Sequence, residues 1–477
     1  MKKKNEKVTL MKREQGWDSL DAKQEAALEK YCRDYIDFLS ASKTERLAYA
    51  NIKALAVSHG FVNLDSIIES GKKLKPGDKI YRGCDGKTLL LAVIGKQPVE
   101  KGTRFVGGHT DCPRLDAKPC PLYQDSDLVL LDTHYYGGIK KYQWTTIPLA
   151  LYGVVIRKDG TKVELAIGDK PGDPVFTVTD ILPHLDNVQS KKTITEAING
   201  EQLNVLFGSR PVAKKDEDKN CKDKTKLRIL RLLNEAYGIE EEDFCSAELE
   251  IVPAGAAREL GFDRSMILGF GQDDRVCGYA AARALMDMKK IPDLTAGALI
   301  CDKEEIGSYG RSGMDSTFFE NTIAELVNAT ADRYSDLTVR RALEHSSMIS
   351  ADVTALHDPG YPESSSPNNQ AKINCGVALS KYTGARGKSS TNDASAEFMG
   401  EIRSIFNKAN VLWQPCEIGR VDVGGGGTIA LYMARMGMNV VDCGVGLLCM
   451  HAPWEVAGKL DVFMAYCGYK AFMEAQA

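Results

Sequence analysis

Long apolar runs, paired cysteine motifs and an excess of one charge are all missing from this 477-residue sequence. Without a stretch of about 18 apolar residues, no membrane-spanning helix is expected. The basic N-terminus also lacks the apolar core of a signal peptide. The 13 cysteines are widely spaced and include no Cys-x-x-Cys pair. We therefore expect most of them to be small buried residues of a protein in a reducing, cytoplasmic setting.

The near balance of charge excludes further classes of protein. The chain carries 61 Lys+Arg against 65 Asp+Glu, a net charge of −4, and its 4 Trp and 18 Tyr are scattered. This composition argues against a protein that coats nucleic acid or an anionic membrane surface. The glycine run 424–427 lacks the Gly-Lys-Ser/Thr ending of a phosphate-binding loop, so nucleotide binding is not expected either.

Two kinds of pattern divide the chain. From about residue 250, predicted strands alternate with predicted helices, which is typical of an α/β fold with a mixed, mostly parallel sheet and helices on both faces. An earlier segment is rich in strands and turn signals instead, and within it residues 213–226 are dense in charge and predict a solvated, mobile loop. We expect a catalytic domain that is interrupted by a β-rich insert, the catalytic domain being 1–112 and 248–477, and the insert 113–247.

Acidic and imidazole side chains lie beside the ends of the predicted strands, where functional residues of open α/β sheets gather. They are His109 and Asp111, Asp273, the pair Glu304-Glu305, Asp352 and His451. Taken singly, each has a structural explanation, such as helix capping by Asp273. Taken together, they supply the nitrogen and oxygen ligands that two divalent ions sharing one carboxylate require. Two adjacent glutamates can also have different roles, one as a metal ligand and the other as a general base.

The order of these residues carries a family resemblance. The chain is similar to the aspartyl aminopeptidase family of dinuclear zinc metallopeptidases in five segments: GGHTDCPRLDAKP, FGQDDRVCG, CDKEEIGS, SADVTALHDPGYP and CMHAPWE. The likeness covers most of the chain, including the β-rich insert. It implies a homo-oligomer, a dodecamer built from dimers, in which the insert pairs the subunits.

The resemblance also assigns roles to the residues. It implies two divalent ions per subunit, zinc in the first place, although cobalt or manganese could occupy such a site. One ion would take His109, Asp273 and Asp352, and the other Asp273, Glu305 and His451. Glu304 is the implied general base, and Asp111 orients His109.

Five further residues resemble the substrate-binding positions of the family: His184, Lys372, Lys381, Tyr382 and Gly426. His184 could donate a hydrogen bond across a subunit interface, but a second histidine that the family has four residues later is replaced here by Val188. A structural role at a domain interface is the alternative for His184. The lysines could equally be solvated surface residues. Gly426 could bring backbone N–H groups to the substrate or simply permit a tight turn.

The sequence therefore predicts a metal-dependent aminopeptidase that removes N-terminal residues, including Asp or Glu, from peptides. The substrate is a peptide, with no nucleic-acid or membrane partner. Two alternatives stay open: a deacylase or other amidohydrolase on the same scaffold, and a catalytically inactive relative that acts as a scaffold or peptide binder. The loss of a ligand would indicate the inactive relative, and none of the implied ligands is missing.

Overall fold

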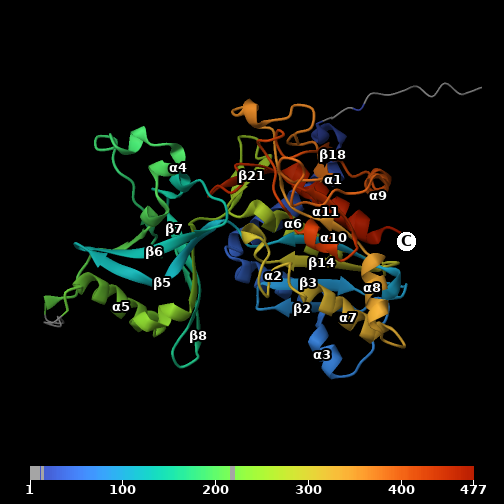
Figure 1. The fold of residues 1–477 in the computed structure, drawn as a ribbon, viewed down its shortest axis with the longest axis horizontal. Helices are drawn as coiled ribbons and strands as arrows, with labels where there is room; N and C mark the ends of the chain where they lie inside the picture. Colours follow the sequence, from blue (N-terminus) through green and yellow to red (C-terminus); the bar gives the residue numbers. More distant parts are fainter. Residues whose placement is uncertain (1–10, 12–14, 215–220, 477) are drawn as a thin grey trace, which may run out of the picture.

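The computed structural model describes residues 11, 15–214 and 221–476, which form two lobes lying side by side (Figure 1). The charged loop predicted over 213–226 falls partly on residues 215–220, outside the described residues. Within the described ranges, no helix combines the length and the apolar character that crossing a bilayer requires.

A nine-stranded sheet forms the centre of the larger lobe. Its strands, in spatial order, are β1 (Val62–Asn63), β2 (Lys79–Cys84), β3 (Thr88–Val93), β14 (Thr295–Cys301), β4 (Thr103–His109), β15 (Ser347–Ser350), β19 (Asn439–Gly444), β17 (Val377–Ser380) and β18 (Trp413–Cys416). The central strands β14, β4, β15 and β19 run parallel, and antiparallel pairs occur toward both edges. The predicted mixed, mostly parallel sheet is confirmed.

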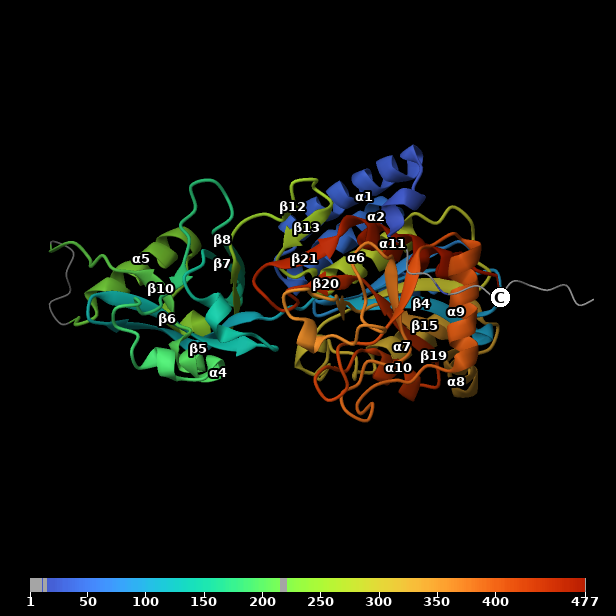
Figure 2. The same ribbon diagram turned by 90° about the horizontal axis from the view of Figure 1, so that it is seen from above.

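Helices cover both faces of this sheet, as predicted (Figure 2). One face carries α1 (Ala22–Ala41), α2 (Glu45–Ser58), α6 (Gln272–Met286), α9 (Ala396–Lys408) and α11 (Lys459–Glu474). The other face carries α3 (Leu64–Glu69), α7 (Phe318–Thr330), α8 (Asp336–Glu344) and α10 (Ala430–Arg435). Local signals place the helix ends: α1 begins at a capping box in which Asp21 and Gln24 each accept the other's backbone N–H. Strands β4 and β14 are buried throughout, because both of their faces are covered.

A small second sheet in this lobe was not predicted. It contains β12 (Arg258–Leu260), β13 (Met266–Gly269), β21 (Glu455–Gly458), β20 (Gly446–Leu448) and β16 (Thr354–Ala355). These strands are two to four residues long, too short for an alternating pattern to reveal them. The sheet matters for function because β16 follows Asp352 and β21 follows His451.

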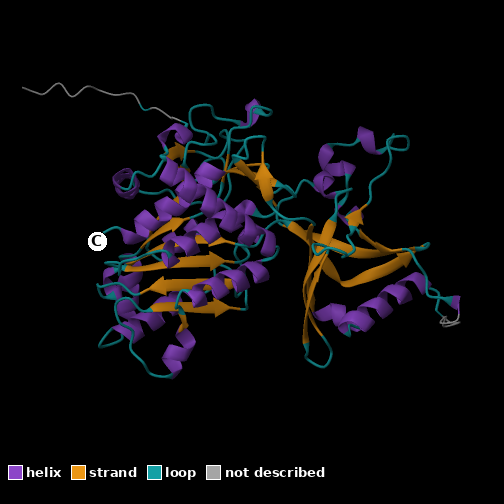
Figure 3. Cartoon of the chain, turned by 180° about the vertical axis from the view of Figure 1, so that it is seen from behind, coloured by secondary structure: helices purple, strands orange, loops and turns teal. Residues whose placement is uncertain are grey.

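The smaller lobe is a seven-stranded sheet with a helix against it (Figure 3). Its strands, in spatial order, are β8 (Lys162–Ile167), β7 (Leu149–Ile156), β11 (Ala247–Pro253), β5 (Arg114–Asp125), β6 (Leu128–Tyr136), β10 (Val205–Gly208) and β9 (Thr177–Val178). Helices α4 (Ile194–Ala197) and α5 (Lys224–Tyr237) complete the lobe. Helix α5 takes up the last residues of the predicted charged loop, because the N–H groups of Thr225 and Lys226 donate to Gln124 on β5.

Buried charges join the two lobes where β5 leaves the larger one. The Arg114 guanidinium lies 3.5 Å from Glu45 at the start of α2 and 3.1 Å from Glu250 on β11. All three side chains are almost fully buried. Glu45 Oε2 and Glu250 Oε2 each lack a conventional hydrogen-bond donor among the described residues. Burial and the neighbouring acids raise the pKa of Glu250, whereas Arg114 and Lys87 outweigh burial and hold the pKa of Glu45 at about 2. A proton shared by the two acids therefore favours Glu250 over Glu45.

This junction predicts unequal effects of two substitutions. Arg114→Met leaves an uncompensated buried carboxylate and should lower the free energy of unfolding by about 3–5 kcal/mol. Glu250→Gln keeps a neutral donor facing Glu45 and should cost about 1 kcal/mol or less. Chemical denaturation of both variants measures the difference. Equal losses in the two variants would contradict the shared proton.

Candidate metal centre

His109 is the last residue of β4, and the backbone fixes the orientation of its ring. Nδ1 lies 2.9 Å from the carbonyl oxygen of Asp111 and 3.3 Å from its Oδ1, so this nitrogen carries the proton. Nε2 is thereby the ring nitrogen that faces Asp273. The preceding residue must be glycine, because a β-carbon on Gly108 would lie 2.8 Å from the Ala351 carbonyl and 2.7 Å from an Asp274 carboxylate oxygen.

The buried Asp111 carboxylate ties three segments together. It accepts the backbone N–H groups of Glu304 and Glu305, each at 3.2 Å, beyond the end of β14. It also accepts the hydroxyl of Tyr136, from the smaller lobe, at 2.8 Å. These hydrogen bonds hold the two glutamates beside the His109 ring.

Asp273 lies between the two imidazoles. Its Oδ1 is 3.3 Å from His109 Nε2, and its Oδ2 is 3.0 Å from His451 Nε2. His451 Nδ1 lies 2.8 Å from the carbonyl of Gly138, so its Nε2 is likewise the nitrogen that faces Asp273. Glu455 accepts the backbone N–H groups of His451 and Asp273 at 2.8 and 3.1 Å, which fixes both segments. One carboxylate thus presents an oxygen to each histidine.

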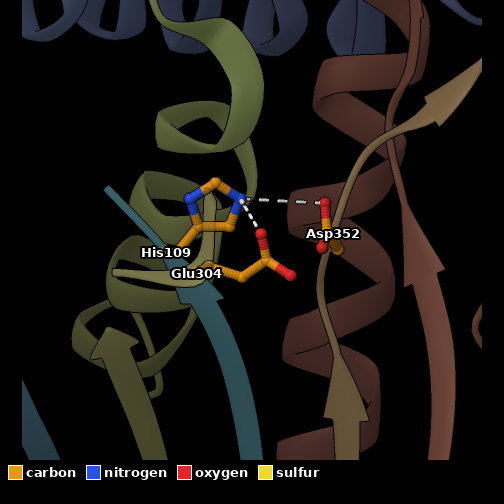
Figure 4. A group of neighbouring side chains, drawn as sticks. All are labelled: His109, Glu304 and Asp352. Atoms are coloured by element: carbon orange, nitrogen blue, oxygen red, sulfur yellow. Dashed lines mark ion pairs between the residues drawn. The ribbon is translucent and has the colours of Figure 1, made fainter. Parts of the chain in front are cut away.

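The remaining acids complete two overlapping groups. His109 Nε2 lies 3.9 Å from Glu304 and 3.9 Å from Asp352, as the dashed lines of Figure 4 show. His451 Nε2 lies 3.6 Å from Glu305. Ligand atoms of His109, Glu304 and Asp352 lie within 4.8 Å of one another, and so do those of His109, Asp273 and Glu305. The structure therefore gathers all seven sequence-predicted metal and catalytic residues at one place.

Crowding of acids shifts the pKa values of this cluster. Burial raises the pKa of Glu304 to about 7, with Asp111 and Asp273 adding to the rise against the opposing His109. Burial alone would lower the pKa of His451, but Asp273 outweighs it and raises the value to about 10. Burial also raises the pKa of Glu305 and Asp352. By contrast, the two histidines hold the pKa of Asp273 below its ordinary range.

Divalent cations fit this set of donors. In the described part of the chain, the only ion-pair partners of Asp273, Glu304, Glu305 and Asp352 are the two imidazoles. Glu305 Oε1 is buried and accepts no hydrogen bond from a described residue. Four largely buried acids without an arginine or lysine need a positive charge from elsewhere. Nitrogen and carboxylate donors of this kind suit zinc and related ions.

A cavity of about 580 Å³ opens over the cluster. Four of the acids and His451 line one part of it, and Gly425–Thr428 line another. Asp442, which lies on β19, accepts the Thr428 hydroxyl at 2.7 Å at the base of this cavity. Burial raises the pKa of Asp442 to about 6. Gly426 therefore lies where a backbone could approach a bound peptide.

The other sequence-predicted substrate residues lie outside this cavity. His184 is exposed in the smaller lobe, between β9 and α4. Lys372 is exposed, and its backbone N–H donates to Gln414. Lys381 pairs with Asp393. Tyr382 lines a neighbouring cavity under Lys388.

Three contributors to the site were missed by sequence reasoning. Glu455 lies in the same segment as His451, and an acid in an otherwise apolar strand could have been suspected. Asp442 likewise interrupts the apolar strand β19. Tyr136 gave no signal, because nothing in the sequence places an insert residue against Asp111.

Known proteins resemble the chain over nearly its whole length. Residues 38–473 match the model of the peptidase family described as aminopeptidase I zinc metalloprotease, M18. A Clostridium acetobutylicum protein named "Probable M18 family aminopeptidase 1" is 48% identical over 457 residues, which cover 96% of this chain and 97% of the relative.

Solved structures agree with this match. The crystal structure of an M18-family aminopeptidase from Thermotoga maritima is 41% identical and superposes with a TM-score of 0.92, covering 98% of this chain and 100% of that one. The S. cerevisiae mApe1 dodecamer shares the fold at 21% identity, with a TM-score of 0.75 over 94% of this chain and 97% of that one. The chain therefore belongs to the M18 family of aminopeptidase I zinc metalloproteases.

Proposed function

We propose that this zinc aminopeptidase removes N-terminal residues from peptides with a water molecule activated between two divalent ions. The observation that carries the proposal is the position of Asp273, whose two oxygens face two different histidines. A carboxylate in this position can bridge two ions. When bound, such ions polarise the scissile carbonyl and lower the pKa of water.

The ligands divide around Asp273. We assign His109, Asp273 and Asp352 to one ion, and Asp273, Glu305 and His451 to the other. The fixed tautomers of both histidines support this division, because each ring presents Nε2 to the shared carboxylate. Zinc is the metal of the family, and cobalt or manganese would meet the same donors.

Glu304 acts as the general base in this proposal. Its carboxyl lines the cavity and has a pKa of about 7, which suits a group that accepts a proton and then donates it to the leaving amine. Asp111 holds the Glu304 backbone and the His109 ring, so it acts by positioning.

The cavity wall bears on the preference for the N-terminal residue. Of the described residues that line it, Arg435 is the sole arginine or lysine, and it pairs with Asp315 at 3.6 Å. Much of the remaining wall is uncharged, including Val353, Ala378 and Leu431. We therefore propose that uncharged N-terminal side chains are preferred over the Asp or Glu that the family resemblance suggests.

An exposed apolar segment supports self-association. Ile181, Leu182, Leu185 and Val188 of the insert are each about half to three-quarters exposed, and clusters of this kind mark interaction surfaces. The yeast neighbour was solved as a dodecamer. We propose that this segment pairs subunits of a homo-oligomer, a dodecamer built from dimers, and brings His184 toward the partner subunit.

The division into a catalytic domain (1–112 and 248–477) and an insert (113–247) remains part of this proposal, but strand β11 (Ala247–Pro253) pairs within the sheet of the smaller lobe, beyond the proposed end of the insert. We also propose a cytoplasmic location, because all 13 cysteines are free thiols, which suits a reducing compartment.

Substitution of Glu304 tests the proposed base. Glu304→Gln should lower kcat/KM on leucine p-nitroanilide by about a hundredfold or more, while the bound zinc per subunit stays unchanged in elemental analysis. Glu305→Gln is the matched control and should lose metal together with activity. Full activity of Glu304→Gln would refute the base assignment. If the wild-type protein cleaved N-acyl amino acids in place of anilides, the deacylase alternative would be favoured.

Metal binding should depend on pH with a definite sign. In the metal-free protein, the neighbouring acids outweigh burial: they raise the pKa of His109, and they raise that of His451 to about 10, which favours protons on both rings. A bound ion must displace these protons, so zinc affinity should rise with pH, by roughly tenfold per unit for each proton released. Calorimetric titration of zinc into chelator-treated protein, in buffers of different ionisation enthalpy, counts the protons. A pH-independent affinity would argue against these ligands.

The assembly surface can be tested separately. Val188→Asp places a charge in the exposed apolar segment and should shift the particle toward smaller species in light scattering after size-exclusion chromatography. Val57→Asp, on a half-exposed valine of α2, is the control and should leave the mass unchanged. A wild-type monomer would contradict the proposed assembly.

A further inference from the structure

A second cavity of about 330 Å³ adjoins the cavity over the metal centre. Thr383 and Ile418 line both cavities. The second one lies between two loops, 382–388 and 417–424. None of the acids or histidines of the cluster lines it, so it extends the substrate space away from the reacting bond.

Close packing fixes the two loops against each other. The N–H of Gly426 donates to the Thr383 carbonyl at 3.0 Å. Gly425 lies so close to Ala385 that a β-carbon would come within 2.4 Å of its Cα. The hydroxyls of Thr383 and Thr391 also bond, at 2.9 Å, across the base of the first loop. The side chains of the second cavity therefore have a defined position relative to the metal centre.

The charge of this cavity is predominantly positive. Arg386, Lys388 and Arg420 line it, against the single acid Glu417. Lys388 lies 3.2 Å from Asp393, an acid that it shares with Lys381, and 3.7 Å from the centre of the Tyr382 ring.

The two arginines keep their charge. Arg420 donates to the carbonyl of Glu363 at 3.1 Å, a contact that positions the guanidinium without neutralising it. The guanidinium of Arg386 has no ion pair and no hydrogen bond with any residue in the described ranges. Arg386 is solvent-exposed, so its charge is accessible to a ligand.

We propose that this second cavity binds the free C-terminal carboxylate of a short peptide whose N-terminus lies at the metal centre. The inference rests on the proposed aminopeptidase function and deepens it by naming the substrate class. Arginine is suited to the role, because its planar guanidinium can hold a carboxylate with two parallel hydrogen bonds. Arg386 is the principal contact, and Arg420 adds charge.

The position of the cavity favours the C-terminal group over an acidic N-terminal side chain. The scissile bond must lie at the metal cluster, whose residues line the first cavity alone. A carboxylate beyond Thr383 and Ile418 is separated from that bond by a length of chain, at about 3.3–3.6 Å per extended residue. The enzyme should accordingly favour short peptides of one matching length over long chains.

The test compares peptide acids with peptide amides. Leu-Gly-Gly and its homologues with one to four glycines are assayed as free acids and as C-terminal amides, and leucine p-nitroanilide serves as a substrate without a downstream carboxylate. At the best length, wild-type kcat/KM should be about tenfold higher for the acid than for the amide. In Arg386→Gln, kcat/KM for the peptide acid should fall to the value for the amide, and kcat/KM for the anilide should be unchanged. Arg386→Lys should keep part of the preference for the acid.

The control is Arg264→Gln, which removes the same charge from an exposed arginine outside the cavity that pairs with Glu259. It should retain the full acid preference. An unchanged acid-to-amide ratio in Arg386→Gln would overturn the proposal, and so would an equal loss on the anilide. The proposal would also be overturned if the wild type preferred aspartate p-nitroanilide over leucine p-nitroanilide and Arg386→Gln lost this preference. That result would assign the cavity to the N-terminal side chain.

Failure of the proposed function is a distinguishable result. If the wild type cleaves no anilide or peptide, the aminopeptidase assignment is wrong. Calorimetric binding of Leu-Gly-Gly and its amide to the wild type and to Arg386→Gln then decides the carboxylate site by itself: tighter binding of the acid that is lost in the variant supports it, and equal binding refutes it.

Discussion

Electrostatic repulsion among four largely buried carboxyl groups is the constraint around which this molecule is organised. Asp273, Glu304, Glu305 and Asp352 lie close together with two imidazoles and no arginine or lysine paired to them in the described structure. Such an arrangement is stable only with bound protons or metal ions. The surrounding sheet, turns and hydrogen bonds hold the acids together against their mutual repulsion.

The smaller lobe takes a direct part in this arrangement. Tyr136 donates to Asp111, and the carbonyl of Gly138 accepts from His451, so each histidine depends on a contact from β6 or the turn after it. The buried Arg114 links the same lobe to the start of α2. A displacement of the smaller lobe would therefore disturb both imidazoles.

The sequence was sufficient for the main architecture and for the members of the metal cluster. His109 and the two glutamates lie at the ends of β4 and β14, which are fully buried strands with apolar runs that the sequence shows clearly. Because these strands are parallel neighbours, their ends lie at the same edge of the sheet. The five-stranded sheet escaped prediction because its strands are short and pair over long sequence distances. Glu455 and Tyr136 escaped for a related reason, since their roles exist only through contacts made after folding. The distribution of protons between Glu45 and Glu250 likewise depends on a distance that no local pattern encodes.

The acceptors that hold the two imidazole rings have an evolutionary consequence. Both Nδ1 atoms face main-chain oxygens, those of Asp111 and Gly138. Every amino acid carries that oxygen, so a codon change at either position cannot delete it. The main-chain part of the support for both rings is consequently insensitive to changes of side-chain identity.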